Sequence, residues 1–240
     1  MNNISKDIVV LADRLSIPSQ SKALLFDMDG VLLDTLSFDY KYVNILLRKY
    51  INESISVSQE IIQRNFALAV PDFFGVILKE YDIVVNEKIF SLITEEFDLL
   101  RSQSNPSIHE GILEILQDAK ERNLLLCVVS NNAKNDVTSI LSNTGLLSYF
   151  EKVVGNDKPG ILKKPAPDMY LEGARLLNVD PSSCVVIEDS VLGAQAGSTA
   201  QCFVVGVGTG ANSFIELEEN EYVNVAYPNF SINPDRSNHE

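Results

Sequence analysis

The sequence of 240 residues is poor in basic residues and contains no tryptophan and only two histidines. Its 19 lysines and arginines stand against 33 aspartates and glutamates, which gives a formal net charge of −14 at pH 7. This acidic excess, without a basic patch, disfavours binding to nucleic acid or to an anionic membrane. An acidic protein that acts on an anionic substrate needs local positive charge, and a bound divalent cation is the obvious source.

Cysteines and long apolar runs are also scarce. The three cysteines, Cys127, Cys184 and Cys202, lie in or beside apolar segments, which is typical of buried free thiols in a reducing compartment. No apolar stretch is long enough to span a bilayer, and the short run at 8–12 lacks the features of a secretory signal. We therefore expect a cytoplasmic protein with no membrane partner.

The pattern of apolar residues predicts an α/β fold. After residue 111, short apolar runs alternate with helical patterns, which is typical of a doubly wound, mostly parallel, Rossmann-like sheet. The N-terminal residues 1–21 are expected to be a short helical extension, because apolar residues at 4–15 follow a helical spacing. The predicted strands are 22–26, 124–129, 152–154, 184–187 and 202–207, with a weak sixth at 222–226.

Residues 36–103 differ from the rest of the chain because they contain four helical patterns and no convincing strand. We predict that they form a small all-helical cap domain inserted after the first strand. The Rossmann-like catalytic core then comprises residues 1–35 and 104–240, with a return linker at 105–107. Such a cap covers the carboxyl edge of the sheet, where open α/β sheets bind ligands.

Four polar segments lie just past predicted strand ends. Because the carboxyl ends of parallel strands meet at one edge of a sheet, we expect these segments to surround one crevice. A buried strand seldom ends in two carboxylates unless something compensates their charge, typically a metal ion. In chain order the candidate residues are Asp27 and Asp29, Ser130 and Asn131, Lys164, and Glu188 and Asp189.

This set of side chains suits phosphoryl transfer through a covalent aspartyl-phosphate. A carboxylate nucleophile needs a nearby cation to approach an anionic phosphate, and Mg²⁺ held by acidic side chains supplies that charge. A lysine and hydroxyl or amide donors can hold the phosphate oxygens. A second carboxylate can protonate the leaving alkoxide and later activate water. The sequence therefore predicts a magnesium-dependent enzyme.

The same segments resemble the four motifs of the haloacid dehalogenase superfamily in order and spacing. The matching residues are 27–35, Ser130-Asn131, 164–168 and 188–190. Within that superfamily the chain is similar to the β-phosphoglucomutase and phosphoglycolate phosphatase group, which carries a helical cap after the first motif. The resemblance extends from Lys22 to about residue 210. It implies phosphate chemistry, since the dehalogenase members lack the second acid, Asp29.

The resemblance also implies a role for each motif residue. Asp27 is expected to be the nucleophile and a Mg²⁺ ligand, and Asp29 the general acid and base with its backbone carbonyl on the metal. Asp189 is expected to ligate Mg²⁺, directly or through water, and Glu188 to complete that shell. The phosphate group is expected to be held by Ser130, Asn131 and Lys164.

The leading function is hydrolysis of a small phosphate monoester, such as a sugar phosphate or a phosphoglycolate-like compound, by a monomer or weak homo-oligomer. A phosphosugar mutase and a non-catalytic ligand-binding protein remain as alternatives. The mutase relatives carry a basic cap residue that holds the distal phosphate, whereas the roughly corresponding segment 68–75 contains no lysine or arginine. The other cap cations considered for the cleft, or for solvated helix faces, are Lys41, Arg48 and Arg64.

Several of these residues also have purely structural interpretations. Asp27 and Asp29, or Glu188 and Asp189, are residue types that cap a following helix. Asp168 is expected to be the N-cap of a helix at 169–177, and Phe73-Phe74 to pack in the cap core rather than contact substrate. His109 is expected to lie in a surface turn.

Overall fold

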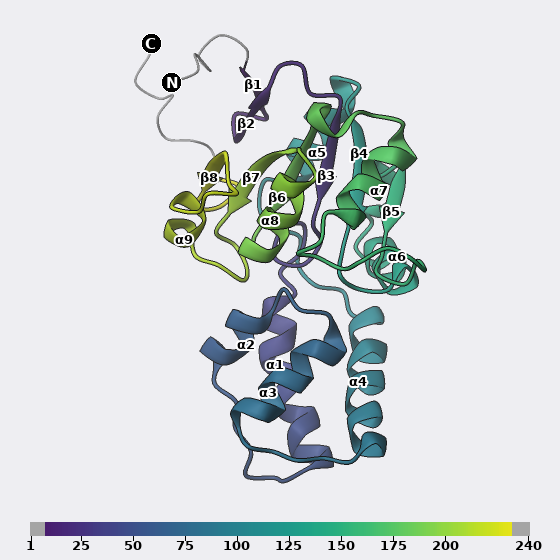
Figure 1. Ribbon diagram of the computed structural model, residues 1–240, viewed down its shortest axis with the longest axis vertical. Coiled ribbons are helices and arrows are strands. Elements are labelled where there is room, and N and C mark those ends of the chain that lie inside the picture. The colour runs from purple at the N-terminus through teal and green to yellow at the C-terminus, as the bar shows by residue number, and fades with distance from the viewer. Residues whose placement is uncertain (1–7, 232–240) are drawn as a thin grey trace.

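A six-stranded parallel sheet forms the centre of the larger part of the molecule (Figure 1). It is described by a computed structural model that covers residues 8–231. The strands lie in the order β5-β4-β3-β6-β7-β8, and all five neighbouring pairs are parallel. Their bounds are β3 (Ala23–Phe26), β4 (Leu125–Val129), β5 (Lys152–Val154), β6 (Cys184–Glu188), β7 (Phe203–Val207) and β8 (Val225–Tyr227). The predicted doubly wound α/β fold is confirmed.

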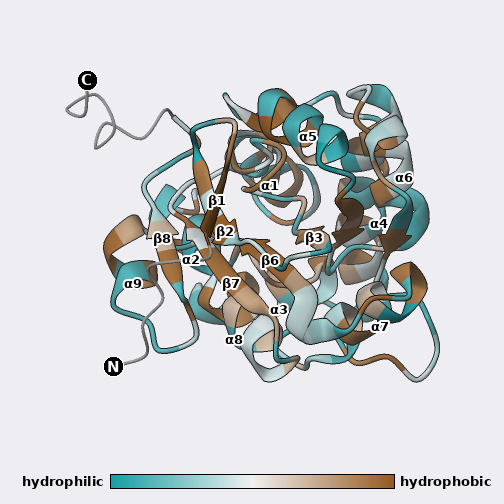
Figure 2. Ribbon diagram, turned by 90° about the horizontal axis from the view of Figure 1, so that it is seen from above, coloured by the Kyte–Doolittle hydropathy of each residue, from teal (hydrophilic) through white to brown (hydrophobic). Residues whose placement is uncertain are grey.

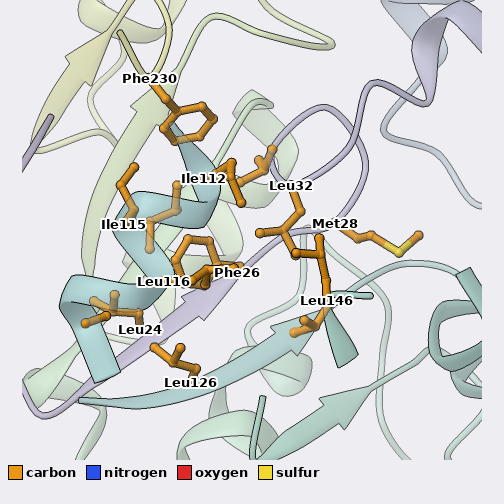
Figure 3. Packing of buried hydrophobic residues seen from close by; sticks show 14 of the residues in the cluster. Leu24, Phe26, Met28, Leu32, Ile112, Ile115, Leu116, Leu126, Leu146 and Phe230 are labelled. Carbon is orange, nitrogen blue, oxygen red and sulfur yellow. The ribbon is translucent and has the colours of Figure 1, made fainter. Parts of the chain in front are cut away.

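Helices cover both faces of this sheet, because alternate residues of each strand point to opposite sides. In β3, Leu24 and Phe26 pack with α5 (Ile112–Glu121) and α6 (Lys134–Asn143), as the close-up of Figure 3 shows for Ile115 and Leu116 of α5. Ala23 and Leu25 belong to a second cluster on the other face, with α7 (Asp168–Leu177) and α8 (Val191–Thr199). Seen from above, the strands are mostly apolar, whereas α5 and α6 beside them carry hydrophilic residues (Figure 2). Shorter elements are η1 (Leu147–Tyr149), η2 (Pro181–Ser183) and α9 (Phe214–Glu218).

The N-terminal segment forms a hairpin, so the helix predicted at 4–15 and the helical extension 1–21 are wrong where the structure describes them. Residues 1–7 lie outside the described part of the chain. Strands β1 (Ile8–Leu11) and β2 (Leu15–Pro18) pair in antiparallel register, and Ala12 and Asp13 between them have φ of 47° and 55°. This turn places Leu11 and Leu15 side by side in the core. An apolar run this short fits either period, and packing against the core decides between them.

The smaller part of the molecule consists of four helices that share their own apolar core (Figure 1). They are α1 (Leu36–Tyr50), α2 (Gln59–Asn65), α3 (Val70–Glu80) and α4 (Glu87–Ser102). Phe73 and Phe74 are buried in this core, and the ring centroids of Phe74 and Phe97 lie 5.1 Å apart. The packing interpretation of these two phenylalanines is therefore confirmed.

Two chain segments connect the helical part to the sheet, and they run side by side. The backbone N–H of Asp34 donates to the carbonyl of Ser107 over 2.9 Å, and the N–H of His109 donates to Leu32 over 3.1 Å. The helices thus lie beyond the carboxyl edge of β3, as the cap prediction requires. Within residues 8–231, every helix is too short or too polar to cross a membrane.

Candidate active site

The four polar segments surround one cavity at the carboxyl edge of the sheet. Its walls come from both parts of the molecule. All seven candidate residues from the sequence line it. The core contributes Asp27, Asp29, Ser130, Asn131, Asn132, Lys164, Glu188, Asp189, Ser190, Leu192 and Gly193, and the helical part contributes Phe66, Ala67, Leu68 and Arg101.

Lys164 is the cation at the floor of this cavity. Its Nζ donates to Asp27 Oδ1 over 2.6 Å, to Glu188 Oε1 over 2.7 Å and to the carbonyl of Val129 over 2.8 Å. The lysine side chain is only 4% exposed. Burial opposes its charge, but attraction by Asp27 and Glu188 outweighs burial and raises the Lys164 pKa. Lys163, the neighbouring alternative, is instead half-exposed beside Asp72.

Asp27 follows β3 directly, and its backbone N–H still belongs to the sheet because it donates to the carbonyl of Ile187 over 3.0 Å. Burial raises the pKa of Asp27 to about 8; Lys164 lowers it, while Glu188 and Asp29 raise it. Burial also raises the pKa of Asp189 well above its ordinary range, again with support from Glu188 and Asp27. Ionising these carboxylates together therefore needs more positive charge than Lys164 alone supplies.

Asp27, Glu188 and Asp189 each offer a carboxylate oxygen, and these three oxygens lie within 4.8 Å of one another. A buried, oxygen-only donor set with surplus negative charge fits Mg²⁺. Asp189 Oδ2 also accepts from the N–H of Ala211 over 2.6 Å. Nothing in the donor set favours a softer metal.

Glu188 is the most heavily hydrogen-bonded of the three acids. In addition to Lys164, Tyr170 donates its hydroxyl to Oε1 over 2.6 Å, and Ser190 donates Oγ–H to Oε2 over 2.9 Å. These bonds fix the position of Lys164 through Glu188. They favour Asp27 and Asp189 over Glu188 as direct ligands of a metal ion.

The acidic residues that were interpreted as helix caps, Asp27, Asp29, Asp168, Glu188 and Asp189, do not occupy N-cap positions. Thr35 is the N-cap of α1. Ser190 is the N-cap of α8, where its Oγ accepts from the N–H of Gly193. Pro167 is the N-cap of α7, so Asp168 is already the first helical residue and makes no cap bond. The physical reason is that Pro167 itself adopts helical backbone angles, with φ of −72° and ψ of −13°.

Asp29 also lines the cavity, and it accepts hydrogen bonds from three parts of the chain. Thr35 Oγ1 and Arg101 Nη2 donate to its Oδ1 over 2.6 and 2.8 Å. Asn132 Nδ2 donates to its Oδ2 over 2.6 Å. Both carboxylate oxygens are therefore held.

Ser130 and Asn131 lie where the second segment meets the helical part. Ser130 is buried, and its Oγ accepts from the N–H of Asn132 over 3.2 Å. Asn131 accepts from the N–H of Lys164 over 3.1 Å and donates to the carbonyl of Ala67 over 3.2 Å. Asn131 thus links the lysine segment to the helical part beside the cavity.

The sequence did not identify Arg101, which is the cap cation that lines this cavity. It belongs to the last turn of α4 and is 5% exposed. The three cations considered instead lie elsewhere: Arg64 pairs with Glu80 over 2.8 Å, Arg48 donates to the carbonyl of Ile55, and Lys41 lies over the ring of Tyr42. The available signal was the place of Arg101, at the helix end next to the return linker.

His109 is also placed differently from the prediction. It is half-buried, and its ring centroid lies 6.4 Å from that of Phe230. Its Nε2 has no hydrogen-bond partner among residues 8–231. Burial lowers the pKa of His109. A turn does begin at His109, whose carbonyl accepts from the N–H of Ile112 over 3.2 Å, but the side chain is half-buried because it lies beside Phe230.

Comparison with known proteins agrees with this geometry. The model of the haloacid dehalogenase-like hydrolase family matches residues 24–207. A β-phosphoglucomutase of Bacillus subtilis is 29% identical over 199 residues, covering 79% of this chain and 84% of the relative. Hexitol phosphatase B of Escherichia coli is 28% identical over 201 residues, covering 78% and 83%.

Solved structures share this fold. The crystal structure of a β-phosphoglucomutase from Clostridium difficile is 26% identical, with a TM-score of 0.72 over 88% of this chain and 92% of that one. A predicted phosphoglycolate phosphatase from Haemophilus somnus shares the fold, with a TM-score of 0.77 at 20% identity over 88% and 95%. The chain therefore belongs to the haloacid dehalogenase-like hydrolases, as a phosphoryl-transfer enzyme of the group that contains sugar phosphatases and phosphoglucomutases.

Proposed function

We propose that this enzyme is a Mg²⁺-dependent phosphatase that hydrolyses a small phosphate monoester through an aspartyl-phosphate on Asp27. The observation that carries the proposal is the buried contact of Asp27 with Lys164, next to the acidic oxygens of Glu188 and Asp189. A carboxylate held beside a cation at the base of a small cavity is suited to attack on a phosphate.

In this proposal Asp27 and Asp189 hold Mg²⁺, together with the backbone carbonyl of Asp29. The ion supplies the positive charge that lets two anions approach each other. Glu188 orients Lys164, and Lys164, Ser130 and Asn131 hold the phosphate oxygens. Residues 36–103 act as the cap domain and residues 1–35 with 104–240 as the catalytic core.

The reaction then has two steps. An oxygen of Asp27 attacks phosphorus, the bond to the leaving oxygen breaks, and Asp29 donates a proton to that oxygen. In the second step Asp29 takes a proton from water, the water oxygen attacks phosphorus, and the bond to Asp27 breaks. Inorganic phosphate leaves, and both carboxyl groups return to their starting state.

A phosphosugar mutase is the second candidate, and similarity to β-phosphoglucomutases favours it. A mutase must hold a second phosphate, which calls for a second cation. Arg101 is the one cap cation among the residues that line the cavity, and it is already engaged with Asp29. This arrangement favours the phosphatase.

The deciding experiment measures inorganic phosphate released from a panel of sugar phosphates, phosphoglycolate and nucleotides, with Mg²⁺ or with EDTA. Metal-dependent release from one or a few esters supports the phosphatase. Conversion of a sugar monophosphate to its isomer, activated by a sugar bisphosphate and without net phosphate release, would replace it with the mutase. Binding without either reaction would contradict both.

A further inference from the structure

Arg101 is a buried arginine in direct contact with the carboxylate proposed as general acid and base. Its Nη2 lies 2.8 Å from Asp29 Oδ1 and 3.8 Å from Asp39 Oδ2. The guanidinium carbon lies 5.9 Å from the ring centroid of Phe66 and 5.8 Å from that of Phe97. The two aromatic rings of the cap, the Asp39 carboxylate of α1 and the Asp29 carboxylate of the loop after β3 therefore fix its orientation.

The end of α4 is also fixed to the core. Asn143 of α6 donates its side-chain N–H groups to the carbonyls of Ser102 and Ser104, over 3.3 and 3.2 Å. Ser102 directly follows Arg101, and Ser104 lies two residues further along the chain. Arg101 thus projects from a segment that is held against the sheet domain. A side chain anchored in this way can fix the orientation of the Asp29 carboxylate.

The orientation of the Asp29 carboxylate depends on such contacts because Asp29 lies in the loop that follows β3. Thr35 and Asn132 supply one donor each, from the linker before α1 and from the loop after β4. Arg101 supplies the charged donor, and an ionised donor makes the stronger hydrogen bond to a carboxylate. Removal of Arg101 therefore removes the strongest of the three restraints on the Asp29 carboxylate.

We propose that Arg101 is the positioning residue of Asp29, and that it contributes to turnover through the proton transfers of Asp29 rather than by contact with the phosphate. The inference rests on the proposed phosphatase function. It predicts a specific kinetic signature: loss of Arg101 should slow esters that need a proton on the leaving oxygen and spare those that do not.

The test is a double-mutant cycle with two aryl phosphates that differ in leaving group, phenyl phosphate and nitrophenyl phosphate. The variants are Arg101→Met, Asp29→Ala and the double variant, with Arg64→Met as a control because Arg64 is an exposed cap arginine that pairs with Glu80. The ratio of the two rates within one sample does not depend on how much protein is folded. Arg101→Lys and a thermal melt of each variant report on the fold.

General acid and base catalysis contributes about 10²–10⁴-fold, so Arg101→Met should lower kcat on phenyl phosphate by about tenfold or more. On nitrophenyl phosphate the loss should be several times smaller. In the Asp29→Ala background, Arg101→Met should have no further effect on the ratio, and Arg64→Met should leave it unchanged. Arg101→Lys should recover part of the loss.

Equal losses on both substrates would assign Arg101 a structural role and overturn the proposal. A further loss in the Asp29→Ala background, seen as a higher KM, would assign it to substrate binding instead and would also overturn it. If the wild-type enzyme releases no phosphate from either substrate or from the panel, the phosphatase function itself fails, which is a distinct outcome.

Discussion

The carboxylate of Glu188 lies against the backbone of Gly193, where a Cβ atom would come within 1.9 Å of Oε1. The same oxygen accepts hydrogen bonds from Lys164 and Tyr170. The first turn of α8 therefore determines where Glu188 lies, and Glu188 determines where Lys164 lies. Gly193 therefore supports the position of Lys164 because it has no side chain to displace Glu188.

Gly193→Ala should lower turnover strongly although alanine is a better helix former than glycine. The added methyl group displaces Glu188, which moves Lys164 away from Asp27. The matched control is Gly75→Ala, an exposed position in α3 with no heavy atom within 4 Å of an added Cβ. This control should keep full activity and gain up to about 1 kcal/mol in free energy of unfolding. Steady-state rates give the activity of each variant, and urea denaturation gives its free energy of unfolding. Full activity of Gly193→Ala would contradict the proposed arrangement.

Lys164→Met should abolish turnover and lower the free energy of unfolding by about 3–5 kcal/mol, the usual cost of removing one partner of a buried ion pair. Methionine leaves Asp27 and Glu188 without their common cation. Lys163→Met tests the adjacent position, where the lysine is 41% exposed and its contact with Asp72 is 3.3 Å long. It should change stability by less than about 1 kcal/mol and leave the rate intact. The interpretation fails if the two variants lose the same amount of activity.

Asp29→Ala should slow phenyl phosphate far more than nitrophenyl phosphate. Nitrophenolate is a good leaving group and needs little protonation, whereas phenolate depends more on the acid. The measurement is the formation of aspartyl-phosphate in a single turnover, so that the later attack of water does not affect the comparison. Equal losses on the two substrates would remove Asp29 from the role of general acid.

Asp39 should make the metal-free protein less stable as the pH rises from 5 to 8. Burial raises the pKa of Asp39 from 3.8 to about 7, although Arg101 opposes the shift. Between these values the folded state binds more protons than the unfolded state, so the free energy of unfolding falls as pH increases. The stabilising contribution of protonated Asp39 to the free energy of unfolding is complete below pH 4 and is lost as the pH rises through 7.

Asp39→Asn isolates this effect, because asparagine resembles the protonated acid. The variant should be somewhat more stable than the wild type at pH 5, and its advantage should be larger at pH 8, as judged by urea midpoints in EDTA. Asp27 and Asp189 give both proteins a slope of the same sign, so only the difference between the proteins reports on Asp39. A less stable variant at pH 8 would show that the attraction of Arg101 outweighs burial.

The sequence predicted the sheet and the convergence of its polar loops because both follow from local patterns. Buried parallel strands are short apolar runs, and strand order places their carboxyl ends at one edge. Asp27 and Lys164 are 137 residues apart, yet each follows a recognisable strand or motif. Their proximity was therefore predictable without coordinates.

Arg101 and Tyr170 were not predicted as parts of the site, because their positions depend on tertiary packing. An arginine on an amphipathic helix faces solvent by default, and the packing of α4 against α1 and α6 turns Arg101 inward. The N-terminal hairpin escaped prediction for a similar reason, since Ala12 and Asp13 adopt left-handed backbone angles that neither residue type signals strongly.

Covalent phosphorylation of Asp27 is the central claim, and trapping the phosphoenzyme tests it most directly. Asp29→Ala is mixed with nitrophenyl phosphate and Mg²⁺, quenched in acid and examined by peptide mass spectrometry, beside the Asp27→Asn/Asp29→Ala double variant. Without its general base, the single variant should hydrolyse the intermediate slowly. The account predicts one phosphoryl group on the peptide that contains Asp27, absent from the double variant. Nitrophenol release with no phosphorylated peptide, or with the phosphoryl group on another residue, would contradict it.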